Sequence, residues 1–140
     1  MLSSLRQFIP TLAVLLSLAV LPSAALAQHK ELIHAIHAVE TGSRLGPIVG
    51  DNGAALGPLQ IHRACWEDAN LPDGTYLDCA DLAYSKRVFK AYMARYATVR
   101  RLGRPVTDQD RARIWNGGPN GYKKTATIKY WTKVRKELNR

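Results

Sequence analysis

The sequence has very few cysteines, and their scarcity limits the kinds of site that the chain can build. Only two are present among 140 residues, Cys65 and Cys79. Two cysteines without paired histidines beside them do not supply the four ligands of a structural zinc site. In an oxidising compartment such a pair usually forms a disulfide, which would stabilise the fold by roughly 3 kcal/mol in the chain-entropy model. The alternative is two buried free thiols.

Other signatures of catalytic and metal sites are missing as well. No Gly-x-Ser-x-Gly segment is present, which argues against a serine hydrolase with a nucleophile elbow. His34, His37 and Glu40 recur at every third position, but on an α-helix they spread over about 120° and would converge poorly on a metal ion. Exposed or capped histidines are the simpler interpretation, so we expect neither a metal nor a cofactor.

A long apolar run is also absent, except near the N-terminus. Leu12–Leu21 is apolar apart from Ser17, follows Arg6, and precedes small residues that end at Ala27. This order is typical of a signal peptide, and the run is shorter than the ~20 residues that span a bilayer. We expect residues 1–27 to be a cleaved signal peptide of an exported protein, periplasmic or secreted, with no stable membrane insertion afterwards. Residues 28–140 then form one domain of 113 residues, too small for two hydrophobic cores.

Acidic residues are scarce relative to basic ones. The chain carries 11 Asp and Glu against 20 Lys and Arg, a formal net charge of +9. Without Arg6, which belongs to the expected signal peptide, the charge is +8. A charge of this size attracts anionic partners over long range, and nucleic acid, anionic lipid and bacterial wall polymers all qualify. Export disfavours nucleic acid, which is mostly found inside cells, and leaves the wall as the natural target.

What the sequence does contain is a periodicity that predicts a mainly α-helical, α+β domain with about five helices and a small β-hairpin. Glycines between residues 46 and 57, with the turn signal Asp51-Asn52-Gly53, predict the hairpin. Thr107 is expected to cap a short helix, and Asp78 or Asp81 to open the longest one. Helices are expected at 29–41, 58–69, from one of these aspartates to 102, at 107–115 and from 125, the last with Ile128, Trp131, Val134 and Leu138 facing inward.

Two carboxylates are candidates for acid–base chemistry. Glu40 falls in the last turn of the first predicted helix, where burial would raise its pKa toward the operating pH, as a general acid requires. Asp51 follows eleven residues later, in the predicted hairpin. Carboxylates on a helix end and a facing hairpin can flank a glycosidic bond, one protonating the leaving oxygen and the other attacking or stabilising the anomeric carbon. The plainer interpretations are an exposed glutamate and a turn-forming aspartate.

The loop that runs from Asn116 to Gly121 is a third candidate element. Its sequence is Asn-Gly-Gly-Pro-Asn-Gly, and glycines let a backbone approach a ligand closely. Trp115 and Tyr122, on either side of it, could offer aromatic faces to sugar rings. A plain turn between two helices is the alternative.

These segments together resemble a known family. In order along residues 28–140, the sequence is similar to invertebrate-type (destabilase-type) lysozymes, and it suggests a bacterial branch. Goose-type lysozymes and lytic transglycosylases share a weaker version of the pattern. The matching segments are Val39–Gly42, Gly50–Gly53, Gly57–Ile61, Cys65–Asp68 and Trp115–Lys124, followed by Thr127, Tyr130 and Trp131.

The resemblance implies an α-rich lysozyme fold with a glycan-binding cleft between two lobes. Glu40 aligns with the family's general acid and Asp51 with its second carboxylate. Peptidoglycan strands would be the substrate, and protein lysozyme inhibitors are further partners to expect. The family usually has a histidine where Trp115 stands and serines where Ala54 and Ala55 stand, which argues against isopeptidase activity. The residues expected to bind substrate are Gln60, Ile61, Trp115, Asn116, Gly117 and Tyr122.

Three functions therefore compete at the level of sequence. The first is a muramidase that hydrolyses β-1,4 bonds of peptidoglycan with Glu40 as acid and Asp51 as second carboxylate. The second is a lytic transglycosylase that uses Glu40 alone, first as acid and then as base. The third is a non-catalytic cationic protein that binds the wall through basic residues on a lysozyme scaffold. Product analysis separates the first two, and a Glu40→Gln variant with full lytic activity would favour the third.

Overall fold

The structure is a computed structural model that describes the backbone of residues 23–140 and the side chains from residue 32 onward. The predicted signal peptide, residues 1–27, falls almost entirely outside this described part and stays a prediction. Within the described residues, no helix has both the length and the apolar character that crossing a membrane requires.

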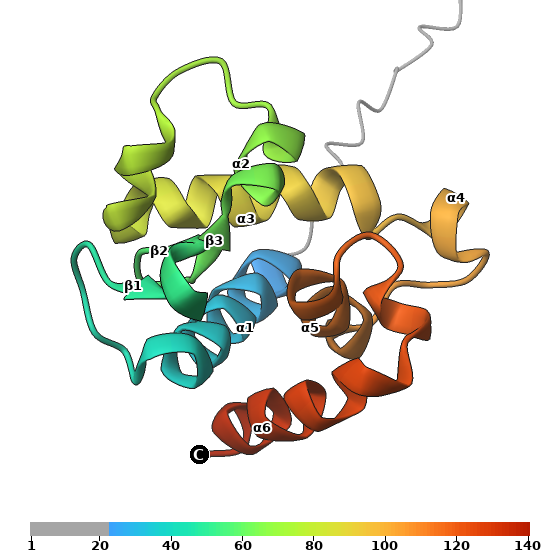
Figure 1. Ribbon diagram of the computed structural model, residues 1–140. Coiled ribbons are helices and arrows are strands. Elements are labelled where there is room, and N and C mark those ends of the chain that lie inside the picture. Colours follow the sequence, from blue (N-terminus) through green and yellow to red (C-terminus); the bar gives the residue numbers. More distant parts are fainter. Residues whose placement is uncertain (1–22) are drawn as a thin grey trace, which may run out of the picture.

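Six α-helices and one small antiparallel sheet make up the described part of the chain (Figure 1). The mainly helical α+β fold is thus confirmed. Short 3-10 turns connect several of these elements. The helices are α1 (Ser23–Thr41), α2 (Arg63–Ala69), α3 (Leu82–Tyr96), α4 (Val99–Leu102), α5 (Asp108–Gly117) and α6 (Ile128–Leu138), and the strands are β1 (Val49–Gly50), β2 (Ala55–Leu56) and β3 (Ile61–His62).

The hydrophobic core joins residues from both ends of the chain. Helix α1 packs along α6 and also contacts α5, while α5 contacts α3 and α6. The side chains of Leu32 and Ile36 on α1, Phe89 on α3, Ile114 on α5 and Val134 on α6 have at most 1% of their surface exposed. Because α1 lies at the centre of this packing, its last turn is held between elements that are distant in sequence.

The predicted hairpin is confirmed and is extended by a third strand. β1 pairs with β2 in antiparallel register, Val49 opposite Leu56, and β2 pairs with β3, Leu56 opposite Ile61. The turn between β1 and β2 is Asp51–Gly53, and all three of its residues have positive φ. This left-handed backbone suits Asn and Gly, and it turns the chain within three residues.

Three local predictions about the helices were wrong. The helix expected from Pro58 begins only at Arg63, because Pro58 lies in a tight turn in which Gln60 donates its N–H to the Gly57 carbonyl and adopts a φ of 51°. The helix expected to reach residue 102 ends at Tyr96, and α4 starts separately after it, with Thr98 as its cap. Ile128, expected to face inward, opens α6 and is 48% exposed.

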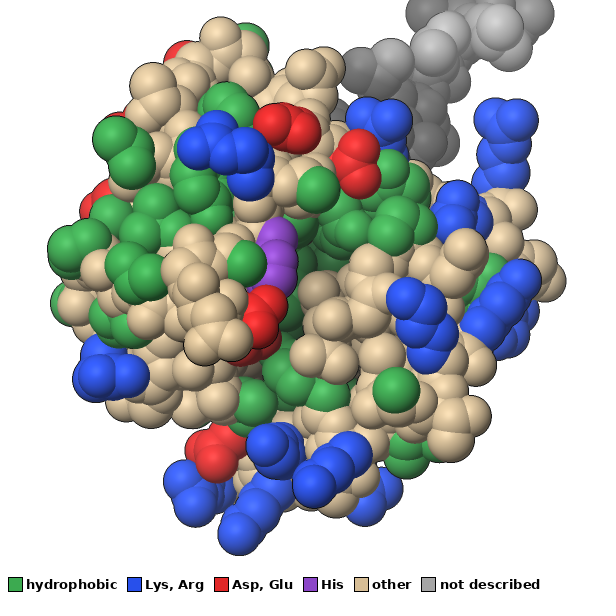
Figure 2. Space-filling view, viewed as in Figure 1, with side chains coloured by type: hydrophobic (Ala, Val, Ile, Leu, Met, Phe, Trp, Pro, Cys, Tyr) green, Lys and Arg blue, Asp and Glu red, His purple; other side chains and the backbone are tan. Residues whose placement is uncertain are grey.

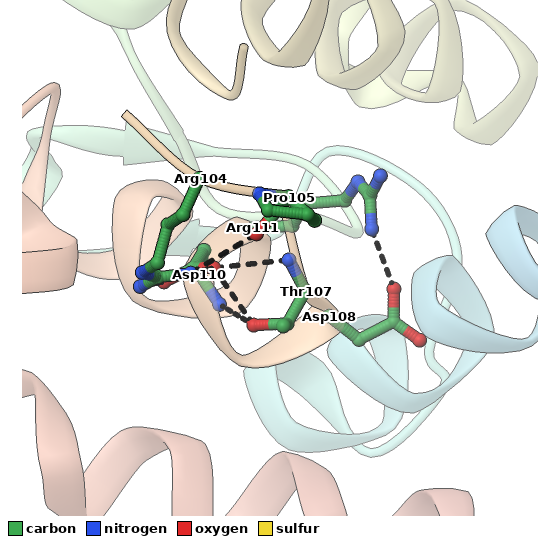
Figure 3. Close-up of polar contacts among 6 residues, drawn as sticks. All are labelled: Arg104, Pro105, Thr107, Asp108, Asp110 and Arg111. Atoms are coloured by element: carbon green, nitrogen blue, oxygen red, sulfur yellow. Dashed lines mark hydrogen bonds and ion pairs between the residues drawn. The ribbon is translucent and has the colours of Figure 1, made fainter. Parts of the chain in front are cut away.

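Helix α5 begins at a capping box whose buried carboxylate, Asp110, also pairs with the half-exposed Arg104 (Figure 3). The side chain of Thr107 accepts from the Asp110 N–H, and Asp110 in turn accepts from the Thr107 N–H. Both carboxylate oxygens of Asp110 also accept from Arg104, each at 2.7 Å. Burial opposes the charge of Asp110, but these hydrogen bonds outweigh burial and lower its pKa to about 2. The predicted cap at Thr107 is confirmed, and it fixes where α5 starts.

Charge is divided unevenly along the described chain. Residues 51–81 contain six acidic side chains and one basic one, Arg63. Residues 82–140 contain sixteen basic side chains and three acidic ones. Figure 2 shows basic side chains gathered along the lower edge of the molecule, where α6 lies, and a hollow near the middle that is edged by acidic side chains and a histidine.

Candidate active site

Glu40 lies in the last turn of α1, as the sequence predicted. The helix ends at Thr41, and the next residue, Gly42, has a φ of 64°, the left-handed conformation that commonly follows a helix. Thr41 fixes this end of the helix, because its hydroxyl group donates to the carbonyl oxygen of Pro58 at 3.0 Å. The end of α1 is thereby tied to the turn that precedes β3.

The carboxyl group of Glu40 is partly buried and faces α6. Its Oε1 atom accepts a hydrogen bond from the hydroxyl group of Tyr130 at 2.6 Å. Burial raises the pKa of Glu40 from 4.5 to about 7, against the opposing effects of the Tyr130 hydrogen bond and the positive charge of Lys133. The predicted burial and rise in pKa are therefore confirmed. A carboxyl group with this pKa is present in both protonated and ionised forms near neutral pH, and the protonated form can donate a proton.

Asp51 has a very different environment at the start of the β1–β2 turn. Its side chain is 65% exposed, and Oδ2 lies 3.2 Å from Nε2 of His62, the last residue of β3. The backbone of Asp51 has a φ of 49°. The carboxylate is therefore hydrated and beside an imidazole. The structure brings Asp51 and His62 together, a pairing that the sequence analysis missed.

Gln60 holds the hairpin together. Its side-chain amide nitrogen donates to the carbonyl oxygens of Ile48 and Gly57, at 3.2 and 2.9 Å. The amide oxygen packs so closely on Gly50 that a Cβ at that position would overlap it and displace the Gln60 amide group. Ile61, the next residue, is 1% exposed and belongs to the core. Gln60 and Ile61, both predicted to bind substrate, thus make their contacts within the protein. There they hold β3, the strand that contains His62.

The predicted substrate-binding loop begins at the C-terminal end of α5. The ring of Trp115 is partly exposed and packs against Phe89, with ring centroids 5.0 Å apart. Asn116 is exposed. Gly117 lies so close to the Thr127 methyl group that a Cβ would overlap it, and its carbonyl oxygen accepts from Lys124 Nζ at 2.6 Å. Gly117 therefore allows close contact with another part of the same protein, Thr127.

Tyr122 follows that loop within the 3-10 turn Gly121–Lys123. Its ring is partly exposed, and the ammonium group of Lys123 lies 5.2 Å from the ring centroid. Trp115 and Tyr122 thus both present part of an aromatic ring to solvent, from the two sides of the same loop.

Cys65 and Cys79 are free thiols in the structure. Burial raises the pKa of both to about 12, and the negative charge that Cys79 would carry contributes to the rise at Cys65. Neither thiol therefore ionises readily in this form, and a buried thiol is a poor nucleophile. The disulfide between them stays a prediction.

The histidines of α1 have separate surroundings. His37 is buried, and its Nε2 lies 2.7 Å from the carbonyl oxygen of Arg44, whereas His34 is exposed. Among the described residues, no group of three or more His, Cys, Asp or Glu side chains is arranged to hold a metal ion.

Local sequence patterns did not predict that Tyr130 and Lys133 act on Glu40. Tyr130 was one of the residues that carried the family resemblance, and its place in that pattern was the only available signal. Helical periodicity could not have revealed the contact, because Tyr130 and Glu40 are 90 residues apart.

Comparison with known sequences identifies relatives of this chain. The model of the destabilase family matches residues 29–137. Lysozyme 1 of Crassostrea virginica is 40% identical over 108 residues, which are 76% of this chain and 58% of that protein. The chain therefore spans less than two thirds of that relative. A lysozyme of Meretrix lusoria is 36% identical over 100 residues, 70% of this chain and 80% of that protein.

Comparison with solved structures gives the same relationship. Meretrix lusoria lysozyme, in its crystal structure with PliI of Aeromonas hydrophila, matches with a TM-score of 0.67 and 34% identity. The lysozyme of Tapes japonica matches with a TM-score of 0.66 and 30% identity. Each match covers 76% of this chain and 88% of the other. By sequence and by fold, the chain belongs to the destabilase family of invertebrate-type lysozymes.

Proposed function

We propose that this protein is a muramidase, a glycoside hydrolase that cleaves the β-1,4 bond between N-acetylmuramic acid and N-acetylglucosamine in peptidoglycan. Glu40 is the general acid that protonates the leaving oxygen. Asp51 is the second carboxylate, which attacks the anomeric carbon or stabilises its developing positive charge. The names and structures of the relatives support lysozyme-type hydrolysis, and the two carboxylates of this chain supply the chemistry.

The observation that carries the proposal is the raised pKa of Glu40. A general acid works best when its pKa lies near the operating pH, because it must hold a proton and yet release it readily. Burial provides this at Glu40, where the pKa is about 7. An ordinary glutamate would be almost fully ionised at neutral pH and could not protonate a leaving group.

The environment of Asp51 suits the complementary role. Water surrounds most of its side chain, so burial does not penalise a negative charge there, and the neighbouring His62 can donate a hydrogen bond to Oδ2. A negative charge near the anomeric carbon stabilises the oxocarbenium-like transition state of glycoside hydrolysis. The rigid hairpin, braced by Gln60, keeps this carboxylate on a fixed support.

The glycan chain would bind along the exposed parts of the loop after α5. Trp115 and Tyr122 offer aromatic surface for the apolar faces of sugar rings, and the side chain of Asn116 is free to face solvent as a hydrogen-bonding group. Gly117, Gln60 and Ile61 would act as the framework beneath this surface. The net positive charge would favour encounter with the anionic wall.

Digestion of purified peptidoglycan, with products identified by mass, tests this function. The protein is expected to release muropeptides with reducing ends, and a Glu40→Gln variant of the same fold should release essentially none. Full activity in the variant would overturn the assignment of Glu40. If neither protein yields products while both bind the wall, the chain is a wall-binding protein on a lysozyme scaffold.

Lytic transglycosylation is a second candidate, and one observation favours it. A carboxyl group with a pKa of about 7 can act first as acid and then as base in the same catalytic cycle. In that mechanism the 6-hydroxyl group of the muramic acid itself displaces the leaving group, so that a 1,6-anhydro end forms and no water is consumed. Anhydro-muropeptides in the same mass analysis would establish this reaction in place of hydrolysis.

The proposed function also sets the cellular context. We propose export through the signal peptide of residues 1–27, to the periplasm or the medium, and a disulfide between Cys65 and Cys79 in that oxidising environment. Titration of free thiols in the exported protein tests the second point, because a formed disulfide leaves none. A protein inhibitor is a further proposed partner, since a relative was crystallised with PliI.

A further inference from the structure

Glu40 receives a hydrogen bond from the opposite end of the chain. The Tyr130 hydroxyl group lies 2.6 Å from Oε1 of Glu40, and it belongs to α6, which packs along α1 (Figure 1). The ring of Tyr130 packs against the hydrophobic core. The hydroxyl group is therefore held at this carboxyl group by the packing of two helices.

The hydroxyl group of Tyr130 remains a hydrogen-bond donor throughout the pH range of interest. Burial, with the negative charge and hydrogen bond of Glu40, raises the pKa of Tyr130 well above 10. A neutral carboxyl group has one carbonyl oxygen, which accepts, and one hydroxyl oxygen, which carries the proton. Because Oε1 accepts from Tyr130, the proton of the neutral acid belongs on the other oxygen, Oε2.

We propose that Tyr130 is the positioning residue of the catalytic acid: by donating to Oε1, it keeps that oxygen as an acceptor and places the transferable proton on Oε2. This inference rests on the proposed role of Glu40 as general acid. In the reaction the O–H bond at Oε2 breaks, the proton moves to the glycosidic oxygen, and the carboxylate left behind is stabilised by the same Tyr130 hydrogen bond.

Other charged groups on α1 and on the helices that pack against it do not duplicate this role. Lys133, one turn further along α6, lowers the pKa of Glu40 by its charge. Arg113 of α5 donates instead to Thr127 and to the carbonyl oxygen of Lys124. His37, one turn earlier on α1, is bonded to the carbonyl oxygen of Arg44. Tyr130 thus supplies the directional contact to one oxygen of Glu40.

The chain offers a matched control for removal of this hydroxyl group. On α3, Tyr96 donates its hydroxyl group to the carboxylate of Asp68 in α2 at 2.9 Å. The two tyrosines make the same kind of hydrogen bond between two helices. Tyr96→Phe therefore removes an equivalent bond away from α1 and α6, and it reports the general cost of such a loss.

The experiment compares the mature protein with its Tyr130→Phe and Tyr96→Phe variants, both checked for folding by circular dichroism. The side-chain carboxyl of Glu40 is titrated by ¹³C NMR, and kcat/KM for peptidoglycan is measured against pH. In Tyr130→Phe, the pKa of Glu40 and the alkaline limb of the profile should both move up by about one pH unit, because a hydrogen bond to the charged form is lost. At the pH optimum, kcat should fall about tenfold, because the proton is no longer directed to one oxygen.

The Tyr96→Phe control should leave both the titration and the profile unchanged. An unchanged Glu40 titration in Tyr130→Phe, or an equal change in Tyr96→Phe, would overturn the inference. If the native protein cleaves no peptidoglycan, the proposed function fails, and the NMR titration still decides whether Tyr130 governs the proton of Glu40.

Discussion

The two candidate carboxylates differ in almost everything except their chemistry. Glu40 lies at the end of a central helix, is partly buried, and accepts a hydrogen bond from a partly buried tyrosine. Asp51 begins a hairpin turn, is 65% exposed, and lies beside a histidine at the surface. Burial gives Glu40 a pKa of about 7, whereas Asp51 keeps its contact with water. The comparison teaches that the fold places the same functional group in two opposite environments, which suit the two proposed roles.

Removing the carboxyl group of Glu40 should have the largest effect on activity. Glu40→Gln keeps the size of the side chain and can still accept a hydrogen bond from Tyr130, but it has no proton to transfer at neutral pH. We expect the initial rate of wall digestion to fall by about 10³-fold or more. Equal thermal unfolding curves would show that the loss is chemical, and a fall of less than tenfold would contradict the role of acid.

Removing the charge of Asp51 should have a smaller effect. Asp51→Asn keeps the turn, because asparagine tolerates positive φ, but it cannot stabilise a positive charge at the anomeric carbon. A loss of about 100-fold in kcat is expected for an electrostatic contribution of this kind. Retained activity, together with anhydro products, would mean that Glu40 works alone and that the contrast between the two carboxylates has no catalytic meaning.

The pH dependence of activity should follow Glu40. In the proposed mechanism protonated Glu40 is the active form, and its pKa is about 7. Above that pH, kcat/KM should fall about tenfold for each pH unit as the proton is lost. A rate profile measured from pH 5 to pH 9 at constant ionic strength tests this. An alkaline limb near pH 5 would show that burial does not raise the pKa of Glu40.

The smallest expected effect is on the free energy of unfolding, and it follows from the raised pKa of Glu40. The folded pKa of Glu40 is above the ordinary value of 4.5, so the folded state binds its proton more tightly than the unfolded state does. This contribution to the free energy of unfolding is complete below pH 4.5 and is lost as pH rises through about 7. Relative to the native protein, Glu40→Gln should therefore gain about 3 kcal/mol at pH 8 compared with pH 4.

Urea unfolding of the native protein and of Glu40→Gln at these two pH values measures that difference. A pH-independent difference between native protein and Glu40→Gln would show that the burial of Glu40 does not disfavour its charge.

The sequence predicted what depends on local chemistry. The Asp51-Asn52-Gly53 turn and the Thr107 cap of α5 are each encoded within a few residues, and both are present. For the start of α3 the sequence offered Asp78 or Asp81, and Asp81 is the cap. The place of Glu40 at a helix end was predictable for the same reason, because Gly42 marks where the helix stops.

What the sequence could not predict depends on contacts between distant segments. Pro58 is compatible with the start of a helix, but pairing between β2 and β3 draws the residues after it into a strand instead. The bond between Glu40 and Tyr130 and the pair formed by Asp51 and His62 likewise exist only after folding. Family resemblance pointed to these regions, but the partners within them came from the structure.

The packing of α6 along α1 has a consequence for how the proposed acid forms during folding. Glu40 lies on α1, and the Tyr130 hydroxyl group that contacts it lies on α6, 90 residues later. Until α6 has docked, Glu40 lacks this contact, and we expect its carboxyl group to ionise as in an ordinary glutamate. A chain without α6 is therefore expected to lose the proposed acid although both candidate carboxylates remain in it.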